Sequence, residues 1–185
     1  MTDQDLMAFM LDLVRSHHFG KHRGTVVSNT DEEGRGRLKV KVPSVLADQA
    51  VWALPCVPYA GDGVGLLSLP PVGTGVWVEF EGGDLSYPIW AGCFWADKEA
   101  PEQGDATVKI WKTDKATIRI DDAADEILLQ NGSQARVALA DSVVTEAGRA
   151  KHSVGSSGVV SQQGGGKVQV TVASVSVNNG ALVVA

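Results

Sequence analysis

Three histidines near the N-terminus are the densest group of potential metal ligands in the chain. His18 and His22 are four residues apart, a spacing that places two imidazoles on one face of a helix, and His17 precedes them. Gly20 interrupts a helix between them, and no third ligand follows at a suitable spacing. We therefore expect a solvated helix end here, and the sequence predicts no metal site.

Two carboxylates, Glu79 and Glu81, flank Phe80 and would share one face of a strand. Paired carboxylates hydrolyse glycosidic bonds when one of them is buried and a cleft holds the sugar. No stretch of domain size remains to build such a cleft. We expect a solvated pair, not a catalytic one.

The remaining candidates for chemistry are weaker. His152 precedes Ser153 in a Gly/Ser-rich segment without the pattern of a nucleophile elbow. The glycine-rich stretches 61–63 and 73–75 open no helix and carry no following Lys-Ser/Thr, so we expect turns and not phosphate-binding loops. The sequence predicts no catalytic residue and no cofactor.

Cys56 and Cys93 are too few for a disulfide framework and lack metal-ligand spacing. We expect both to be small buried thiols in strands.

Overall charge narrows the possible partners. The formal net charge is −6 and the pI is near 5.1, which argues against a surface that binds nucleic-acid phosphates. No apolar stretch approaches the length of a transmembrane helix, and the acidic start lacks the basic region of a secretory signal. We expect folding in a cytoplasm.

The elements that would position any site begin with an amphipathic helix over residues 2–18. Thr2 is a suitable N-cap with Asp5 three residues later, and Gly20 is a plausible stop. Its apolar stripe, at positions i, i+4, i+7 and i+8, consists of Leu6, Met10, Leu13 and Val14.

Five short strands are predicted before Pro101, with turn residues between them. They cover residues 25–28, 37–42, 51–57, 75–80 and 89–95. Five strands in so short a segment favour a small OB-fold barrel. The aromatic residues expected to fill its core are Trp52, Trp77, Phe80, Trp90 and Phe94.

Composition changes abruptly near Pro101. Every aromatic residue except Trp111 lies before it, as do both cysteines. The following segment alternates apolar and polar residues, with predicted strands at 106–111, 116–120, 135–139, 168–172 and 175–177. Its Val, Ala, Ile and Leu side chains form too thin a layer for a two-sheet sandwich. We expect strands from several copies of the chain to face a common axis in a narrow prism.

Three ordered stretches carry a resemblance to a known family. They are Val57–Gly65, Pro71–Asp84 with its V-x-V-E-F-E-G-G-D pattern, and Tyr87–Gly92, supported by Gly36–Pro43 upstream. Residues 20–97 resemble the baseplate assembly protein V family, the OB-domain part of phage tail spikes and of VgrG-like spikes in contractile injection systems.

This resemblance implies a homotrimer whose OB domains ring the base of a triangular β-helix needle. The needle would be attached to the tube-initiating hub on the N-terminal side and would meet the target membrane only on firing. Such particles assemble in the producer's cytoplasm. Some relatives carry a lysozyme-like domain after the OB domain, but only a short linker occupies that place here.

Some spikes of this kind also end in an iron-binding His-x-His motif, which this chain lacks. Its apolar end instead predicts a binding surface for a separate PAAR-like tip protein. The candidate tip-binding residues are Asn179, Ala181, Leu182, Val183, Val184 and Ala185.

The expected fold is therefore all-β with a short N-terminal helix: an OB-fold barrel followed by a trimeric intertwined β-helix needle. The expected parts are a helix at 1–19, an OB domain at 20–97, a linker at 98–105 and a spike at 106–185. The alternative function is an OB-fold module that binds nucleic acid or oligosaccharide and carries a trimerising β-tail. Single-strand binding requires aromatic residues on a basic groove, and acidic residues such as Glu79, Glu81 and Asp84 neighbour the aromatics here.

Overall fold

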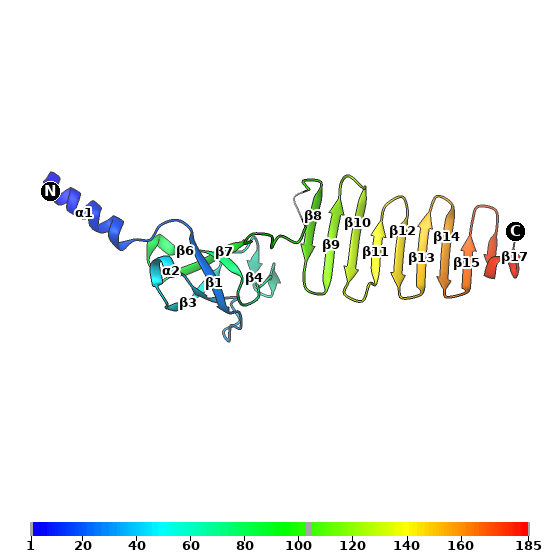
Figure 1. The fold of residues 1–185 in the computed structure, drawn as a ribbon, viewed down its shortest axis with the longest axis horizontal. Coiled ribbons are helices and arrows are strands. Elements are labelled where there is room, and N and C mark those ends of the chain that lie inside the picture. The colour runs from blue at the N-terminus through cyan, green and yellow to red at the C-terminus, as the bar shows by residue number, and fades with distance from the viewer. Residues whose placement is uncertain (1, 103–104, 185) are drawn as a thin grey trace. The chain divides into compact units, whose positions relative to one another are not determined.

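The computed structural model describes residues 2–102 and 105–184. The chain forms two compact units, Met1–Glu99 and Ala100–Ala185. The first contains a helix and a closed barrel, and the second is a single antiparallel sheet (Figure 1). The predicted class, all-β with one short N-terminal helix and an OB-type barrel followed by a β-rich segment, is confirmed. No helix in the described part of the chain is long and apolar enough to cross a membrane.

Helix α1 covers Asp3–Ser16 and begins as its sequence predicts. The Asp5 backbone N–H donates to Thr2 Oγ1 at 3.2 Å, and Thr2 N–H donates to Asp5 Oδ2 at 2.8 Å. This reciprocal capping box satisfies two of the backbone donors that a helix start leaves open.

The helix ends four residues before the predicted stop at Gly20. His17 already has an extended backbone, although its N–H still donates to the Leu13 carbonyl. The next residue, His18, donates its N–H to the Gly83 carbonyl at 2.8 Å. A backbone hydrogen bond to the barrel therefore replaces the last turn that the sequence alone favoured.

The barrel has five strands that close in the order β1-β2-β3-β7-β6. β3 and β7 run parallel, and every other neighbouring pair is antiparallel. The strands are β1 (His22–Ser28), β2 (Leu38–Lys41), β3 (Ala50–Pro55), β6 (Gly75–Phe80) and β7 (Pro88–Phe94). β6 has the predicted bounds, β1 starts earlier than predicted, β2 is shorter at both ends, and β3 and β7 both start and end earlier.

The barrel core is mostly aliphatic. Its buried members are Val26, Leu38, Val40, Val42, Ala53, Val76, Val78, Phe80 and Trp90. Of the five aromatics expected in the core, only Phe80 and Trp90 are buried. In β6 the inward positions fall on Val76, Val78 and Phe80, so Trp77 points outward because side chains alternate along a strand.

The outward aromatics form a cluster of their own. The Trp77 and Phe94 rings lie 5.0 Å apart, and the Arg23 guanidinium lies over both, at 5.0 Å and 4.7 Å from their centroids. Trp52 lies under the Arg37 guanidinium at 5.2 Å. Cation–π contacts of this kind stabilise the half-buried aromatic rings that lie outside the core.

Four short elements of the first unit were not predicted. Helix α2 (Pro43–Leu46) follows β2 directly, and its Val45 and Leu46 pack against the core. Strands β4 (Ala60–Gly61) and β5 (Val64–Gly65) form a separate, exposed hairpin, and η1 (Glu81–Gly83) follows β6. Elements of two to four residues are too short to show a hydrophobic period.

The second unit is a ten-stranded sheet in which each strand is antiparallel to its neighbours in sequence. Its elements are β8 (Val108–Lys112), β9 (Ala116–Asp121), β10 (Glu126–Asn131), β11 (Arg136–Leu139), β12 (Val143–Ala147), β13 (Ala150–Gly155), β14 (Gly158–Gln163), β15 (Gly166–Val170), β16 (Val175–Val177), η2 (Asn178–Gly180) and β17 (Leu182–Val184). The prediction that β15 extends to Val172 was wrong, because Thr171 turns the chain by accepting a hydrogen bond from Ser174.

Gly158 is the glycine whose small size this sheet most requires. It has a φ of +126°, and a Cβ atom at this position would lie 2.1 Å from the Val170 carbonyl oxygen on the next strand. Only a residue without a side chain fits there. Gly158 therefore allows the backbones of β14 and β15 to approach each other closely where β14 begins.

Candidate assembly interface

The two faces of the second unit differ in chemistry. Residues directly opposite each other in antiparallel strands share a face, so the register assigns every side chain. We call one side the apolar face; its aliphatic members are Ile118, Ile120, Ile127, Leu129, Val137, Leu139, Val143, Val154, Val159, Val168, Val170, Val175, Val177, Leu182 and Val184.

One row of this face is aliphatic without interruption. It contains one residue from each strand from β9 to β17, in direct cross-strand register: Ile120, Ile127, Leu139, Val143, Val154, Val159, Val170, Val175 and Val184. β-branched neighbours in such a row stabilise the sheet through side-chain contact. The row therefore joins nine strands into one apolar surface.

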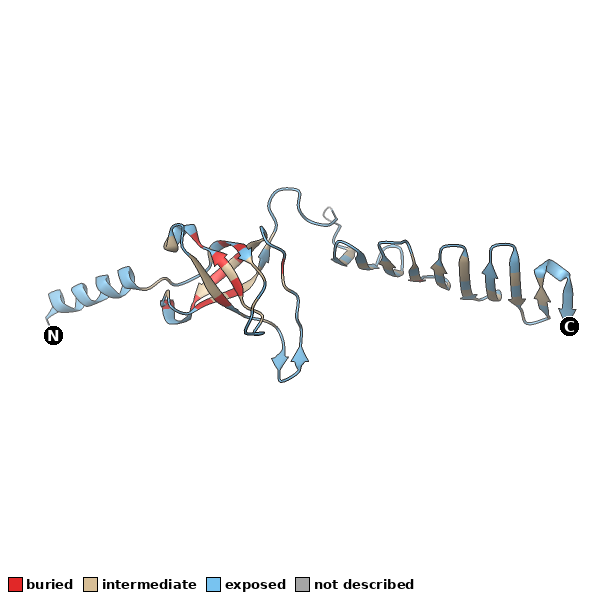
Figure 2. Cartoon of the chain, turned by 90° about the horizontal axis from the view of Figure 1, so that it is seen from below, coloured by how far each residue is buried: buried red, intermediate tan, exposed pale blue. Residues whose placement is uncertain are grey.

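This surface is not covered within the chain. Ile127 remains 42% exposed and Val170 41%, and in the described part of the sheet Ala138 alone is buried, at 8%. Figure 2 shows the buried residues gathered in the barrel, whereas the sheet is drawn as exposed and intermediate. A sheet needs a second layer against its apolar face to be stable.

The opposite side, which we call the charged face, is suited to water. Arg136 Nε and Lys151 Nζ contact Glu146 at 2.7 Å and 3.0 Å. Arg119 contacts Glu102 at 3.1 Å and Asp121 at 2.9 Å. The hydrogen bond from Arg136, followed by that from Lys151, lowers the pKa of Glu146. The apolar face is therefore the one whose exposed side chains would be stabilised by a covering layer.

The N-terminal histidines do not form the solvated helix end that the sequence suggested. His22 lies in β1, and its buried Nε2 has no hydrogen-bond partner. The ring of His17 stacks on Phe19 at 5.6 Å, and the rings of His18 and His22 lie 6.4 Å and 5.6 Å from Phe80. The backbone of His18 is held at the barrel, which keeps these imidazoles against aromatic rings. No group of three potential metal ligands occurs within residues 2–102 and 105–184 of one chain.

The two carboxylates that flank Phe80 lie in different elements. Glu79 forms an ion pair with Lys21, while Glu81 begins η1 and is exposed. The glycine stretches lie in turns, as expected: residues 61–63 form the β4–β5 turn, and residues 73–75 lead into β6.

His152 and Ser153 lie on opposite faces of β13, so they cannot act as a pair. His152 Nδ1 instead lies 2.7 Å from Ser161 Oγ, its direct neighbour on β14. This contact could not be predicted from the sequence, because it depends on the cross-strand register.

Both thiols are exposed and free, so the prediction of buried cysteines was wrong. Cys56 follows the end of β3, and Cys93 is the second-last residue of β7. Strand ends lie at the rim of the barrel, beyond its packed centre. Partial desolvation nevertheless raises the pKa of Cys93.

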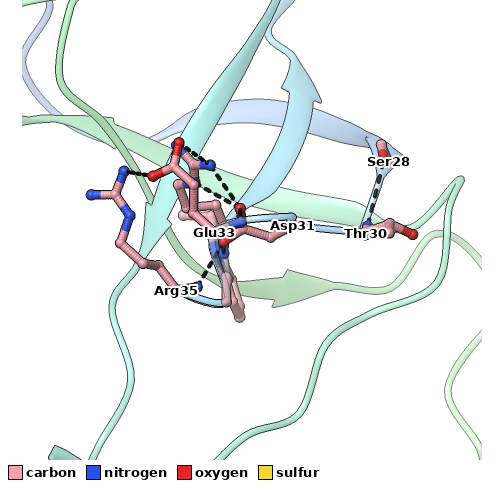
Figure 3. Close-up of polar contacts among 8 residues, drawn as sticks. Ser28, Thr30, Asp31, Glu33 and Arg35 are labelled. Carbon is pink, nitrogen blue, oxygen red and sulfur yellow. Dashed lines mark hydrogen bonds and ion pairs between the residues drawn. The ribbon is translucent and has the colours of Figure 1, made fainter.

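A buried carboxylate organises the turn between β1 and β2. Asp31 accepts hydrogen bonds from the backbone N–H groups of Glu33, Arg35 and Arg37, and from the Arg37 guanidinium at 2.7 Å and 3.0 Å (Figure 3). The hydrogen bond from the Arg37 side chain is the largest cause of the strongly lowered pKa of Asp31. These contacts hold the loop and contain no feature of a catalytic site.

The predicted tip residues lie at the last strand of the sheet. Asn179 belongs to η2, and Leu182, Val183 and Val184 form β17 with exposed side chains. Ala181 is exposed as well, and Ala185 lies outside the described residues. Their role in binding a tip protein remains a prediction.

The strand order of the first unit, a closed barrel with one parallel pair between β3 and β7, defines an OB-type barrel. Residues 22–95 match the family described as the type VI secretion system/phage-baseplate injector OB domain. The barrel matches this family, which confirms the resemblance noted from the sequence. A search of curated proteins found no match.

Proposed function

We propose that the chain is the central spike subunit of a contractile tail or injection machine, and that three copies form a membrane-puncturing needle. The observation that carries this proposal is the apolar face, whose aliphatic row continues over the nine strands from β9 to β17 without a covering layer in the chain itself. Three is the number of copies that the family resemblance implies.

The side chains of the apolar face suit a narrow shared core. They are mostly Val, Ile and Leu, and Trp111 is the one aromatic residue of this half of the chain. Three such sheets, with their apolar faces turned inward, would bury these side chains and leave the ion pairs of the charged face in water. The same arrangement gives each sheet the second layer that it lacks alone.

The proposed mechanism is mechanical. A rod of strands that run across its length is held by cross-strand backbone hydrogen bonds and a shared apolar core, so it can transmit the force of sheath contraction to a small area of membrane. The proposed parts are the helix at 1–19, the OB domain at 20–97, the linker at 98–105 and the spike at 106–185. No catalytic step and no cofactor are needed, and assembly takes place in the producer's cytoplasm before the particle contacts a target membrane.

Helix α1 is proposed to bind the tube-initiating hub. None of its described residues is buried, although its apolar side chains include Leu6, Met7, Phe9, Met10 and Leu11. An isolated helix of this length is marginally stable in water, so docking of the apolar side chains would stabilise it. At the other end, the exposed β17 is proposed to receive a PAAR-like tip protein.

Native mass spectrometry of the full-length chain tests this proposal. The expected species is a trimer of the 19.5 kDa chain at micromolar concentration, with no appreciable retention of single-stranded DNA in filter binding at low salt. A stable monomer would contradict the spike. Tight, salt-sensitive binding of oligonucleotide would instead favour the alternative OB-fold binding module.

A further inference from the structure

A second row of the apolar face is interrupted by polar side chains. This middle row runs through Ile118, Leu129, Val137, Thr145, His152, Ser161, Val168, Val177 and Leu182 in cross-strand register. Thr145, His152 and Ser161 are consecutive members from β12, β13 and β14, with Val137 on one side and Val168 on the other. We call these three residues the polar step.

His152 is distinctive within this surface. Across the apolar face of the described strands β9 to β17 it is the sole titratable side chain, since the charged residues of these strands lie on the charged face. The polar step and the adjacent Val168 and Val177 line an open concavity of about 550 Å³. The apolar face is therefore both polar and concave at the polar step, on strands β12 to β14.

The orientation of the imidazole is fixed from one side. Its Nδ1 lies 2.7 Å from Ser161 Oγ, and Thr145 is its direct neighbour on the other strand. In the tautomer in which Nδ1–H donates to Ser161, the lone pair of Nε2 is available to a ligand. Metal-binding histidines have this arrangement: the second ring nitrogen donates to an oxygen that fixes the tautomer and the ring plane.

The middle row is the one that would come closest to a shared axis. Strands β12 to β14 each place three residues on the apolar face, and the polar step supplies the middle one. This argument rests on the proposed trimer. If three sheets turn this face inward, their flanking rows meet neighbouring sheets at the corners, and their middle rows face each other. Three His152 side chains then converge at one level.

We propose that this level of the needle binds one divalent transition-metal ion per trimer, with one His152 Nε2 from each copy as ligand. Once three sheets cover this face, a buried Nε2 atom without a partner is costly, and one metal ion satisfies the Nε2 atoms of all three copies. Three imidazole nitrogens with an open fourth position suit Zn²⁺ and related ions, whereas Ca²⁺ and Mg²⁺ prefer oxygen ligands. One chain supplies a single histidine, so the site is incomplete without its partner copies.

The test uses the full-length chain without a histidine tag. The protein is equilibrated with excess ZnCl₂, freed of unbound metal and measured by native mass spectrometry and elemental analysis. We expect one zinc per three chains. CoCl₂ in place of zinc should give the visible absorption of four-coordinate cobalt.

Two variants separate the site from the rest of the molecule. His152→Val continues the aliphatic row, so it should preserve the trimer and reduce the zinc content to zero. His18→Ala removes a histidine of the first unit and should leave one zinc per trimer.

Each outcome decides between the possibilities. A metal-free wild-type trimer would overturn the metal site and leave the spike proposal intact. Zinc retained by His152→Val would also overturn it. A monomeric wild-type chain would overturn both proposals, because the three ligands would never meet.

Discussion

At the scale of single residues, Asp31 shows how one buried carboxylate fixes a loop of the barrel. Its side chain is 3% exposed and accepts three backbone N–H groups together with the Arg37 guanidinium. Arg37 also contacts Glu33 at 2.9 Å and covers Trp52. Through Arg37, Asp31 thus links the β1–β2 turn to Trp52 on the outside of the barrel. The hydrogen bonds that Asp31 itself accepts favour its ionised carboxylate.

Asp31→Asn should lower the thermal stability of the barrel at neutral pH. The pKa of Asp31 in the folded protein is lower than its unfolded value of about 3.9, so the ionised carboxylate stabilises the fold fully above about pH 4. That contribution is lost as the pH falls through the folded pKa. The melting temperatures of wild type and variant should therefore converge on acidification below about pH 4. Melting followed by tryptophan fluorescence between pH 7 and pH 2 measures this convergence.

Asp62→Asn is the matched control for this experiment, because Asp62 is exposed in the β4–β5 turn. Its melting temperature should follow that of the wild type at every pH. A constant difference between wild type and Asp31→Asn over the whole range would show that the charge of Asp31 does not matter.

Leu38 is the largest fully buried side chain of the barrel, with 0% exposure. Leu38→Ala should reduce the free energy of unfolding of the barrel by about 2–5 kcal/mol, through lost burial and the cavity left behind. Leu67→Ala, at a position 72% exposed, should change it by less than about 0.5 kcal/mol. Urea titration followed by tryptophan fluorescence compares the two, and equal effects would refute the proposed core.

At the scale of elements, the strands of the second unit separate two environments by alternation alone. Val170 lies on the apolar face of β15, and the adjacent Gln169 lies on the other face. If copies of the chain cover the apolar face, a charge at position 170 is buried without a partner. A charge at position 169 remains in water. Neighbouring positions of one strand thus offer opposite tests of the same interface.

Val170→Lys should dissociate the trimer, because an unpaired buried ammonium is strongly unfavourable. Gln169→Lys should leave it unchanged. Sedimentation velocity at several protein concentrations distinguishes the two states. Equal mass for Val170→Lys and wild type would show that this face does not form the contact between copies.

Alternation also explains how much of the molecule the sequence predicts. It located β6, β9 and β16 closely, since each places apolar residues at every second position. Alternation does not show which face of a barrel strand points inward. The sequence therefore predicts Trp77 in the core, whereas Val76 and Val78 occupy it. The polar step was missed for a related reason. Thr145, His152 and Ser161 become neighbours only through the hairpin registers, which turn geometry determines.

At the scale of the whole molecule, the change in composition near Pro101 separates two ways of burying apolar surface. The first unit closes a barrel around its own core, whereas Ala138 is the one buried hydrophobic residue that the described part of the second unit contributes. The barrel therefore buries its apolar side chains within one chain, whereas the proposed trimer would bury those of the sheet between copies. This division agrees with the proposed spike, in which the barrel is the baseplate domain and the sheet forms the needle.

The last strand of the sheet, like its apolar face, leaves apolar side chains exposed. β17 is paired on one side to β16, and no other described strand pairs with its opposite side. Leu182 is 59% exposed and Val184 62%, so the last strand presents apolar side chains beside a free strand edge. Proteins usually cover such edges, because they pair with other chains. A tip protein of complementary apolar surface would cover both.

Ending the chain after Val177 should therefore abolish incorporation of the tip protein while preserving the trimer. The truncation removes η2 and β17 but leaves the aliphatic row intact from β9 to β16.

The double variant Leu182→Ser, Val184→Ser keeps the chain length and should weaken incorporation of the tip protein, because it removes the apolar side chains of β17. Gln130→Ala, on the charged face of β10, serves as the control and should incorporate the tip protein normally. Quantitative mass spectrometry of purified particles measures the tip protein per spike. A truncated trimer that retains the wild-type amount would show that the tip protein binds elsewhere.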